Sequence, residues 1–163
     1  MTDEEFCALY ETHAPRLWAY VVRATRSRAA ADDIVQESFL RTFEVTTLNR
    51  ANDDHRRRYL YTVATNLIRR HYKRREVPLP DGPFDTAISE SPDEKLAVER
   101  ALEELSEVEC QTLWLAHVEE WSHREIARML GYRDGSLRQV AVRAKRRFME
   151  AFTRHDRSER DES

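Results

Sequence analysis

A stretch that alternates basic and aromatic residues is the first candidate for chemistry. Residues 56–75 read RRRYLYTVATNLIRRHYKRR, with eight Arg or Lys and no Asp or Glu. Aromatic rings stack on unpaired bases while cations follow the phosphate backbone, so the pattern is typical of single-strand binding. Asn66 adds an amide that can hydrogen-bond a base or a phosphate. We interpret the segment as a polyanion-binding surface rather than a merely solvated one, and Tyr61 stays open between a core role and a functional role.

A second basic segment has the pattern of a helix-turn-helix. Ser122 and Glu125 can form a capping box at the start of a short helix, and Gly131 suits a left-handed C-cap. The longer helix that follows has an expected inner stripe of Leu137, Ala141, Ala144 and Phe148. The opposite face holds Gln139, Val142, Arg143 and Arg146, flanked by Arg138 and Lys145, and these side chains are suited to base edges and phosphates in the major groove. An ordinary helical pair with a solvated basic face is the alternative, and many activators and repressors share the motif.

An acidic patch precedes the basic aromatic stretch. Its members fall on one polar flank of an expected helix: Asp32, Asp33, Gln36 and Glu37. Because acids this close to a DNA-binding helix would repel DNA, the patch suits a protein partner better. Compensation of the helix dipole by Asp32 and Asp33 is an alternative of equal weight.

The sequence offers little for catalysis or metal binding. His117 and His123 lack metal-ligand spacing with Cys7 and Cys110, and no phosphate loop or catalytic triad is recognisable. We therefore expect no enzyme activity, no cofactor and no metal. The cysteines are expected to be free buried thiols in a reducing cytosol. No apolar run approaches the roughly 20 residues of a membrane span, and the acidic N-terminus is unlike a signal peptide, so a cytoplasmic protein is expected.

Helices are the elements expected to position these residues. Three glycines in 163 residues are few for a sheet protein. Apolar residues recur at helical spacing over three segments, 3–26, 29–46 and 55–75. A polar segment at 47–54 separates the last two. Thr2 and Glu5 predict a capping box, and Pro15 predicts a kink or a division of the first helix.

A change of composition at 76–92 predicts a linker. Four prolines lie there, and the 20 residues from Glu76 carry six acids and one base although the net charge of the chain is only −3. Four shorter helical patterns follow, at 93–105, 106–119, 122–130 and 135–153, and a frayed tail is expected at 155–163. The sequence thus predicts an all-α fold in which two small helical domains, 1–75 and 93–154, are joined by an acidic Pro-containing linker. The C-terminal domain contains the helix-turn-helix.

Taken together, these segments resemble the bacterial sigma factors. Residues 32–41, DDIVQESFLR, resemble the acidic helix with which sigma factors grip the clamp of the polymerase largest subunit. Residues 59–67, YLYTVATNL, resemble the start of their promoter-melting helix. WSHREIARMLG at 121–131 and GSLRQ at 135–139 resemble their domain that recognises the −35 element. The short chain, with only these two domains, is similar to the extracytoplasmic-function (ECF) group over almost all of residues 5–152.

The chain departs from the family pattern at several positions. In the promoter-melting helix of the family, Trp is common where Tyr59 stands, and Arg is common where Thr62 and Thr65 stand. A Gly is usual where Glu120 stands, just before Trp121. Gln139 and Val140 replace a typical Ser and Arg in the recognition helix. We therefore expect an unusual −35 sequence.

The resemblance implies a role for each surface. Domain 1–75 would be sigma region 2, and domain 93–154 would be sigma region 4. Docking on the clamp falls to Asp32, Asp33, Gln36 and Glu37. A loop at about 46–54, including Asn49, would form the pocket for a flipped −10 base. The opened strand and nearby duplex would be held by Tyr59, Asn66, Arg69, Arg70 and Lys73. The −35 element would be contacted by Ser136, Arg138, Gln139, Val142, Arg143 and Arg146.

The implied function is that of an alternative sigma factor. Such a protein binds core RNA polymerase through its clamp and flap regions, and contacts promoter DNA as duplex at −35 and as opened strand at −10. Its acidic linker threads towards the active centre and the RNA exit path. An anti-sigma partner is a further expectation from the resemblance alone, and membrane insertion is not expected. The rival is a polymerase-independent helix-turn-helix regulator of duplex DNA, which explains 122–148 but leaves the other two surfaces without a role.

Overall fold

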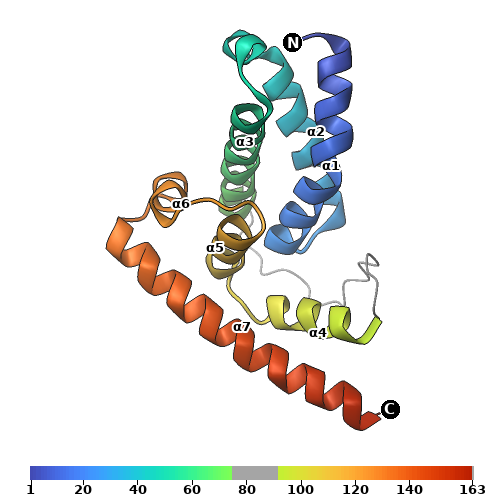
Figure 1. The fold of residues 1–163 in the computed structure, drawn as a ribbon, viewed down its shortest axis with the longest axis vertical. Helices are drawn as coiled ribbons and strands as arrows, with labels where there is room; N and C mark the ends of the chain where they lie inside the picture. The colour runs from blue at the N-terminus through green and yellow to red at the C-terminus, as the bar shows by residue number, and fades with distance from the viewer. Residues whose placement is uncertain (75–91, 163) are drawn as a thin grey trace. The chain divides into compact units, whose positions relative to one another are not determined.

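The computed structural model describes residues 1–74 and 92–162, with side chains from Leu96 onward in the second range. It divides into two compact units, Met1–Pro80 and Asp81–Ser163. All regular structure in the described residues is helical, in seven α-helices and one 3-10 helix (Figure 1). The predicted all-α, two-domain fold is therefore confirmed. The domain limits stay predictions, and all of the predicted linker except Pro92 lies outside the described residues.

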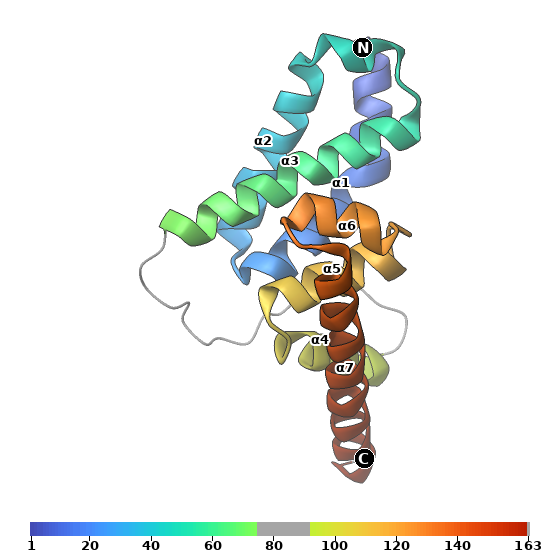
Figure 2. The same ribbon diagram turned by 90° about the vertical axis from the view of Figure 1, so that its left-hand side faces the viewer.

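The first unit contains three α-helices and a short 3-10 helix: α1 (Asp3–Thr25), α2 (Arg28–Glu44), η1 (Thr46–Arg50) and α3 (Asp53–Arg74). α3 packs against both α1 and α2 (Figure 2). The predicted capping box is present, since the Thr2 hydroxyl accepts from the Glu5 amide and the Glu5 carboxylate accepts from the Thr2 amide. Pro15 lies inside α1, which continues as one helix and is not divided.

Two tyrosines occupy the centre of the first unit. Tyr20 on α1 and Tyr61 on α3 are buried, and their ring centroids lie 5.3 Å apart. The hydroxyl groups of Tyr20 and Thr65 share a hydrogen bond of 2.8 Å, which satisfies both polar groups in the interior. Tyr61 is therefore a core residue. Thr65, at a position where the family commonly has Arg, also serves the interior here.

The second unit contains four helices: α4 (Pro92–Glu103), α5 (Glu107–His117), α6 (His123–Leu130) and α7 (Asp134–Glu162). α7 packs against each of the other three (Figure 1). Ser122 and Glu125 form the predicted capping box at α6, and Gly131 ends it in the left-handed conformation with φ 75°. α6 and α7 thus form the predicted helix-turn-helix.

The inner face of α7 differs in part from the predicted stripe. Its buried positions are Leu137, Val140, Ala144 and Ala151. Ala141 and Phe148, which were expected inside, are only half-buried. Because α7 packs in turn against α6, α5 and α4, its buried face follows three partners rather than one straight stripe.

The frayed tail expected after residue 154 is wrong, because α7 continues to Glu162. Three polar side chains hold this extension. Arg154 and His155 bond the Glu104 carboxylate at 2.9 and 2.7 Å, and Glu159 pairs with Arg100 at 3.6 Å. Burial opposes ionisation of Glu104, but the hydrogen bonds from His155 and Arg154 outweigh it and lower its pKa. The part of the anchor that depends on ionised Glu104 is therefore present above the ordinary pKa of a glutamate and is lost as the pH falls through the lowered pKa of Glu104.

The turn before Trp121 has a strained residue. Glu120 has φ 58°, in the left-handed region where a side chain costs about 1 kcal/mol relative to Gly. The turn is held by a hydrogen bond of 2.8 Å from the Trp121 amide to the Leu115 carbonyl. The turn therefore has the left-handed conformation that the Gly usual in the family would adopt without strain.

We expect Glu120→Gly to raise the free energy of unfolding by about 0.5–1 kcal/mol, because glycine removes the steric cost of the positive φ and loses part of that gain to chain entropy. Thermal unfolding of the purified chain measures the change. Glu120→Ala is the matched control and should bring no such gain, since alanine keeps a Cβ. A melting temperature that Glu120→Gly leaves unchanged or lowers would contradict the argument.

A buried carboxylate ties α5 to α7. The Glu109 side chain is 3% exposed and accepts from the Arg147 guanidinium at 2.5 Å. Arg147 also donates to the Glu104 carbonyl at 3.1 Å. Glu109 completes a capping box with Ser106, so one carboxylate serves both a helix start and a contact between helices. Loss of the arginine would leave a buried charge without its cation.

Arg147→Ala should therefore destabilise the chain by about 2 kcal/mol, which is less than for a fully buried pair because the Arg147 side chain is 46% exposed. Urea unfolding followed by tryptophan fluorescence provides the measurement. Arg146→Ala, at the preceding position of α7, which is exposed, should change the free energy of unfolding by less than about 0.5 kcal/mol. Equal effects of the two substitutions would show that the pair with Glu109 does not stabilise this unit.

Candidate nucleic-acid and partner interfaces

The exposed side of α3 carries the residues predicted for the opened strand. Asn66, Arg70 and Lys73 are exposed, while Tyr59 and Arg69 are half-buried. Spacings of three, four and seven residues place all five on one face of the helix, opposite the buried Leu60, Ala64 and Ile68. We call these five residues, Tyr59, Asn66, Arg69, Arg70 and Lys73, the α3 stripe. The stripe combines an aromatic ring, an amide and three cations over about four turns of helix.

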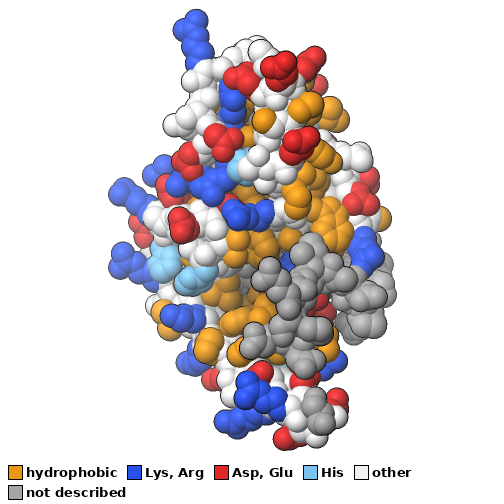
Figure 3. Space-filling view, turned by 45° about the vertical axis from the view of Figure 1, so that its right-hand side comes forward, with side chains coloured by type: hydrophobic (Ala, Val, Ile, Leu, Met, Phe, Trp, Pro, Cys, Tyr) orange, Lys and Arg blue, Asp and Glu red, His pale blue; other side chains and the backbone are white. Residues whose placement is uncertain are grey.

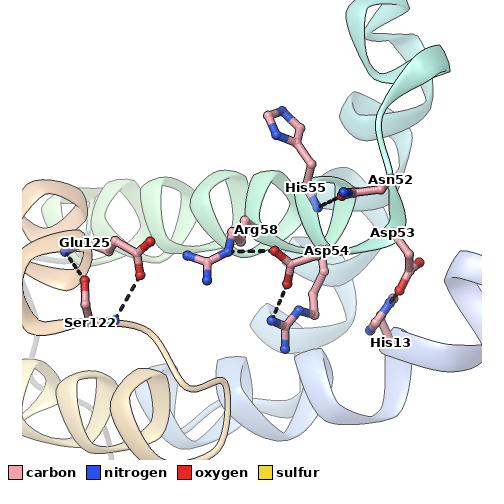
Figure 4. A network of polar contacts seen from close by, with 9 residues as sticks. His13, Asn52, Asp53, Asp54, His55, Arg58, Ser122 and Glu125 are labelled. Atoms are coloured by element: carbon pink, nitrogen blue, oxygen red, sulfur yellow. Dashed lines mark hydrogen bonds and ion pairs between the residues drawn. The ribbon is translucent and has the colours of Figure 1, made fainter.

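The arginines that precede the α3 stripe make internal contacts. Arg57 and Arg58 bond the Asp54 carboxylate at 2.8 and 3.1 Å, and both bonds lower the pKa of Asp54. At this end of α3, His13 of α1 also meets Asp53 at 3.2 Å, and the Asn52 side chain accepts from the His55 amide (Figure 4). Pairs with carboxylates as exposed as Asp54 stabilise a fold by at most about 1 kcal/mol. The polyanion surface inferred for 56–75 is thus strongest in its second half.

Arg56 differs from its neighbours because it is buried. It donates to the carbonyls of Leu48 and Asn49, both at 3.1 Å, and pairs with Glu5 at 3.5 Å. Its guanidinium therefore lies beneath η1, the segment predicted to form the base pocket. Leu48 is buried as well, whereas Asn49 and Arg50 are exposed. The Asn49 side chain also accepts from the amino group of Met1.

The exposed side of α7 carries every residue predicted for the −35 element. These residues are Ser136, Arg138, Gln139, Val142, Arg143 and Arg146, and all are exposed. Gln139, Val142, Arg143 and Arg146 have the spacing of one helical face, and Leu137, Val140 and Ala144 are buried on the other. We call the six exposed residues the α7 face. Val142 is 67% exposed, which leaves an apolar side chain free to meet a thymine methyl group.

The predicted acidic patch is also exposed, and we call its four residues, Asp32, Asp33, Gln36 and Glu37, the α2 acidic face. It borders a groove of about 360 Å³ between α1 and α2, whose apolar walls include Tyr10, Pro15, Trp18 and Val35. The Trp18 indole donates to Asp32 at 2.8 Å, so Asp32 has a structural partner as well. Hydrophobic side chains bordered by acids are visible on this side of the first unit (Figure 3).

The apolar half of this surface was missed by sequence reasoning. Tyr10, Leu40 and Phe43 are 45%, 61% and 40% exposed beside the α2 acidic face. Phe43 follows the buried Val35 and Phe39 at helical spacing but is itself exposed, and its ring centroid lies 4.9 Å from that of Phe6. The surface is therefore apolar and acidic together, a composition suited to a protein partner.

Several negative findings apply to the described residues 1–74 and 92–162. No helix there has the length and hydrophobicity to cross a membrane. Within the same ranges, no three His, Cys, Asp or Glu side chains gather into a metal site. Cys110 is buried as expected, but Cys7 is exposed, so the expectation of two buried thiols is wrong for Cys7.

Comparison with known proteins places both units in one family. Residues 9–77 match Sigma-70 region 2, and residues 95–148 match Sigma-70 region 4. The chain is 33% identical over 151 residues to the ECF RNA polymerase sigma factor SigL of Mycobacterium tuberculosis, with 85% of each chain covered. It is 28% identical over 152 residues to the RNA polymerase sigma factor CarQ of Myxococcus xanthus, covering 86% of this chain and 85% of CarQ.

A solved structure shares the fold. The complex of the sigma factor RpoE with the anti-sigma factor NepR from Bartonella quintana matches with a TM-score of 0.66 at 16% identity, covering 92% of this chain and 98% of the matched chain. Sigma-70 regions 2 and 4 follow one another along the chain in this order. With the identity to SigL, they show that the chain belongs to the ECF RNA polymerase sigma factors.

Its function follows from this membership. The protein is an alternative sigma factor, which binds core RNA polymerase and directs promoter recognition, DNA opening and transcription initiation. The rival, a polymerase-independent regulator of duplex DNA, is not favoured, because region 2 has no counterpart in it.

Proposed function

We propose that the three exposed surfaces, the α3 stripe with η1, the α7 face and the α2 acidic face, each bind a different partner of the sigma factor. The observation that carries the proposal is the composition of the α3 stripe, which places Tyr59, an amide and three cations on one outward face. In this assignment the α3 stripe and η1 hold the opened −10 strand, the α7 face contacts the −35 duplex, and the α2 acidic face docks on the polymerase clamp. The first unit acts as sigma region 2 and the second as region 4.

At −10 the protein has to stabilise bases that have left the duplex. Removing one base from the stack costs a few kcal/mol. Stacking on an aromatic ring returns about 1–3 kcal/mol per base, and Tyr59 is the ring on the α3 stripe. Arg70 and Lys73 neutralise phosphates further along the same face. Asn49, exposed on η1, supplies the amide that hydrogen-bonds a flipped base.

At −35 the chemistry is that of duplex recognition. A recognition helix enters the major groove, where Arg pairs with guanine and Gln with adenine in bidentate geometry. Gln139 and Arg143 lie four residues apart on the α7 face and are proposed to contact bases. Arg138 and Arg146 flank them and are proposed to contact phosphates, which position the helix.

The α2 acidic face and its groove are proposed to receive a basic, partly apolar helical surface of the polymerase clamp. Complementary charge steers the encounter, and the apolar groove contributes buried area. Region 4 is proposed to meet the flap, and the segment 76–92 to thread towards the active centre. An anti-sigma protein, of the kind that accompanies RpoE in its complex, is a proposed regulator. The chain itself is proposed to catalyse no reaction and to act in the cytoplasm, where its polymerase works.

Transcription from defined components tests the function as a whole. The purified chain is mixed with sigma-free core polymerase and a promoter-rich genomic library, and the 5′ ends of the transcripts are mapped. We expect initiation at a small set of sites that share −10 and −35 sequences. The absence of specific initiation at any promoter would contradict the assignment.

Two substitutions should separate opening from duplex binding. Arg143→Ala is expected to weaken binding to a −35 duplex about tenfold, because a base contact of this kind is worth about 1–3 kcal/mol. Tyr59→Ala is expected to leave that binding unchanged and to slow promoter opening, because its ring stacks only on an unpaired base. Fluorescence anisotropy measures the binding, and permanganate reactivity of unpaired thymines measures the opening. Equal effects of both substitutions on duplex binding would favour a regulator that binds duplex DNA only.

A charge reversal tests the clamp contact. Asp33→Lys is expected to weaken the binding of the chain to core polymerase about tenfold or more, because it places a cation against a basic surface. Asp53→Lys is the control, because it makes the same change of charge at an exposed carboxylate of the same unit that lies on α3 and not on the α2 acidic face, and it should leave the affinity within about twofold. The dissociation constant for core polymerase is measured by anisotropy of the labelled chain. An unchanged constant for Asp33→Lys would remove the α2 acidic face from the interface.

A further inference from the structure

A buried arginine supports the segment that faces the −10 strand. Arg56 is 8% exposed although it lies in the most basic stretch of the chain. Its Nε donates to the Leu48 carbonyl at 3.1 Å, and its Nη2 donates to the Asn49 carbonyl, also at 3.1 Å. Two consecutive carbonyls at the end of η1 therefore bind one planar guanidinium. Such a fork holds two acceptors in one fixed geometry, which a single ammonium group cannot do.

The segment benefits from this support because it is a single 3-10 helix of five residues, a form whose hydrogen-bond geometry is poorer than that of an α-helix. At its ends the Leu48 amide donates to the Val45 carbonyl at 3.2 Å, and the Ala51 amide donates to the Leu48 carbonyl at 3.1 Å. Carbonyls at the end of a helix can accept further hydrogen bonds, and basic side chains can supply them. Leu48 is the one buried residue of η1. A single apolar anchor and a guanidinium therefore fix the backbone from which Asn49 projects.

The charge of Arg56 is balanced from a third element. Glu5, in the first turn of α1, pairs with Nη2 at 3.5 Å. The pKa of Glu5 is lowered, first by the hydrogen bond from the Thr2 amide and then by the positive charge of Arg56. A buried guanidinium is tolerated when its donors are matched in this way. The start of α1, the end of η1 and the first turns of α3 thus meet at one side chain.

We infer that Arg56 is a positioning residue for −10 recognition. Its guanidinium holds the η1 backbone in the conformation that presents Asn49 to the flipped base, and it does so without contacting DNA. The inference rests on the proposed role of η1 and goes beyond it by naming the group that fixes its shape. Base selectivity at the flipped position then depends on a residue buried beneath the loop.

The test uses the full chain with core polymerase and a panel of promoters that carry each of the four bases at every −10 position. The selectivity is the ratio of opening rates for the best and the second-best base. Arg56→Met keeps the length of the side chain and removes the fork. We expect selectivity at one −10 position to fall about tenfold or more, since a displacement of about 1 Å is enough for such a loss. Binding to the −35 duplex and to core polymerase should stay within about twofold of the parent.

Two variants keep the result decisive. Arg57→Met, at the next position of α3, removes a cation paired with the exposed Asp54 and should leave the base selectivity unchanged. Arg56→Lys keeps the charge without the fork, and should restore part of the selectivity lost in Arg56→Met. If Arg56→Met fails to fold, as judged by circular dichroism, the comparison of Arg56→Lys with the parent chain tests the inference. We then expect Arg56→Lys to have a lower base selectivity than the parent.

The outcomes separate the inference from the proposed function. If the parent chain opens promoters but shows no base preference at any −10 position, the proposed pocket at η1 fails and takes the inference with it. If the parent shows a preference that folded Arg56→Met and Arg56→Lys both retain, the inference alone is overturned. A loss that is uniform over all bases and −10 positions would equally overturn it, because it would mark Arg56 as structural only.

Discussion

Each helix of a unit this small has to bury one face, and that constraint decides which side chains remain for DNA. In the first unit the buried contact between Tyr20 and Tyr61, with the hydroxyl pair of Tyr20 and Thr65, sets the rotation of α3 about its own axis. Once Tyr61 points inward, Tyr59 and Asn66 have to point away from the core. The same holds for α7, where Val140 and Ala144 face inward and Gln139 and Arg143 face out. The same helical periodicity therefore sets both the buried face and the exposed face that is proposed to bind nucleic acid.

Polar side chains fix the positions of the helices more closely than apolar packing alone can. Apolar burial fixes a helix face but tolerates small shifts along or around the axis. Directional contacts reduce that freedom: Arg147 joins α7 to Glu109 on α5, and Arg56 joins α3 to the end of η1. Arg147 follows the exposed Lys145 and Arg146, whereas Arg56 is followed by Arg57 and Arg58, which pair with Asp54. On α7, neighbouring arginines therefore divide between a contact that stabilises the fold and an exposed position proposed to bind phosphate.

Local patterns made much of this molecule predictable, and distant contacts made the rest unpredictable. Capping boxes and helix faces depend on residues three or four positions apart, so the boxes at Thr2 and Ser122 and the exposed faces of α3 and α7 follow from the sequence. The burial of Arg56 depends on Glu5, 51 positions away, and the order of the α7 end depends on Glu104, about as distant. Composition alone suggested a polyanion-binding role for all the arginines of 56–75, and a frayed tail. No periodicity encodes such pairings, and they became apparent only in the folded chain.

The continuity of α7 has a mechanical consequence. One unbroken helix of 29 residues carries the side chains proposed to contact DNA near its beginning and the bonds to Glu104 in its second half. The separation between Gln139 and His155 is about 24 Å at 1.5 Å per residue. A tilt of about 5° at the anchored end would move the other end by about 2 Å, several times the range over which a hydrogen bond keeps its strength. A ligand or partner that displaced the far end of α7 would therefore shift the residues proposed to bind DNA without contacting them.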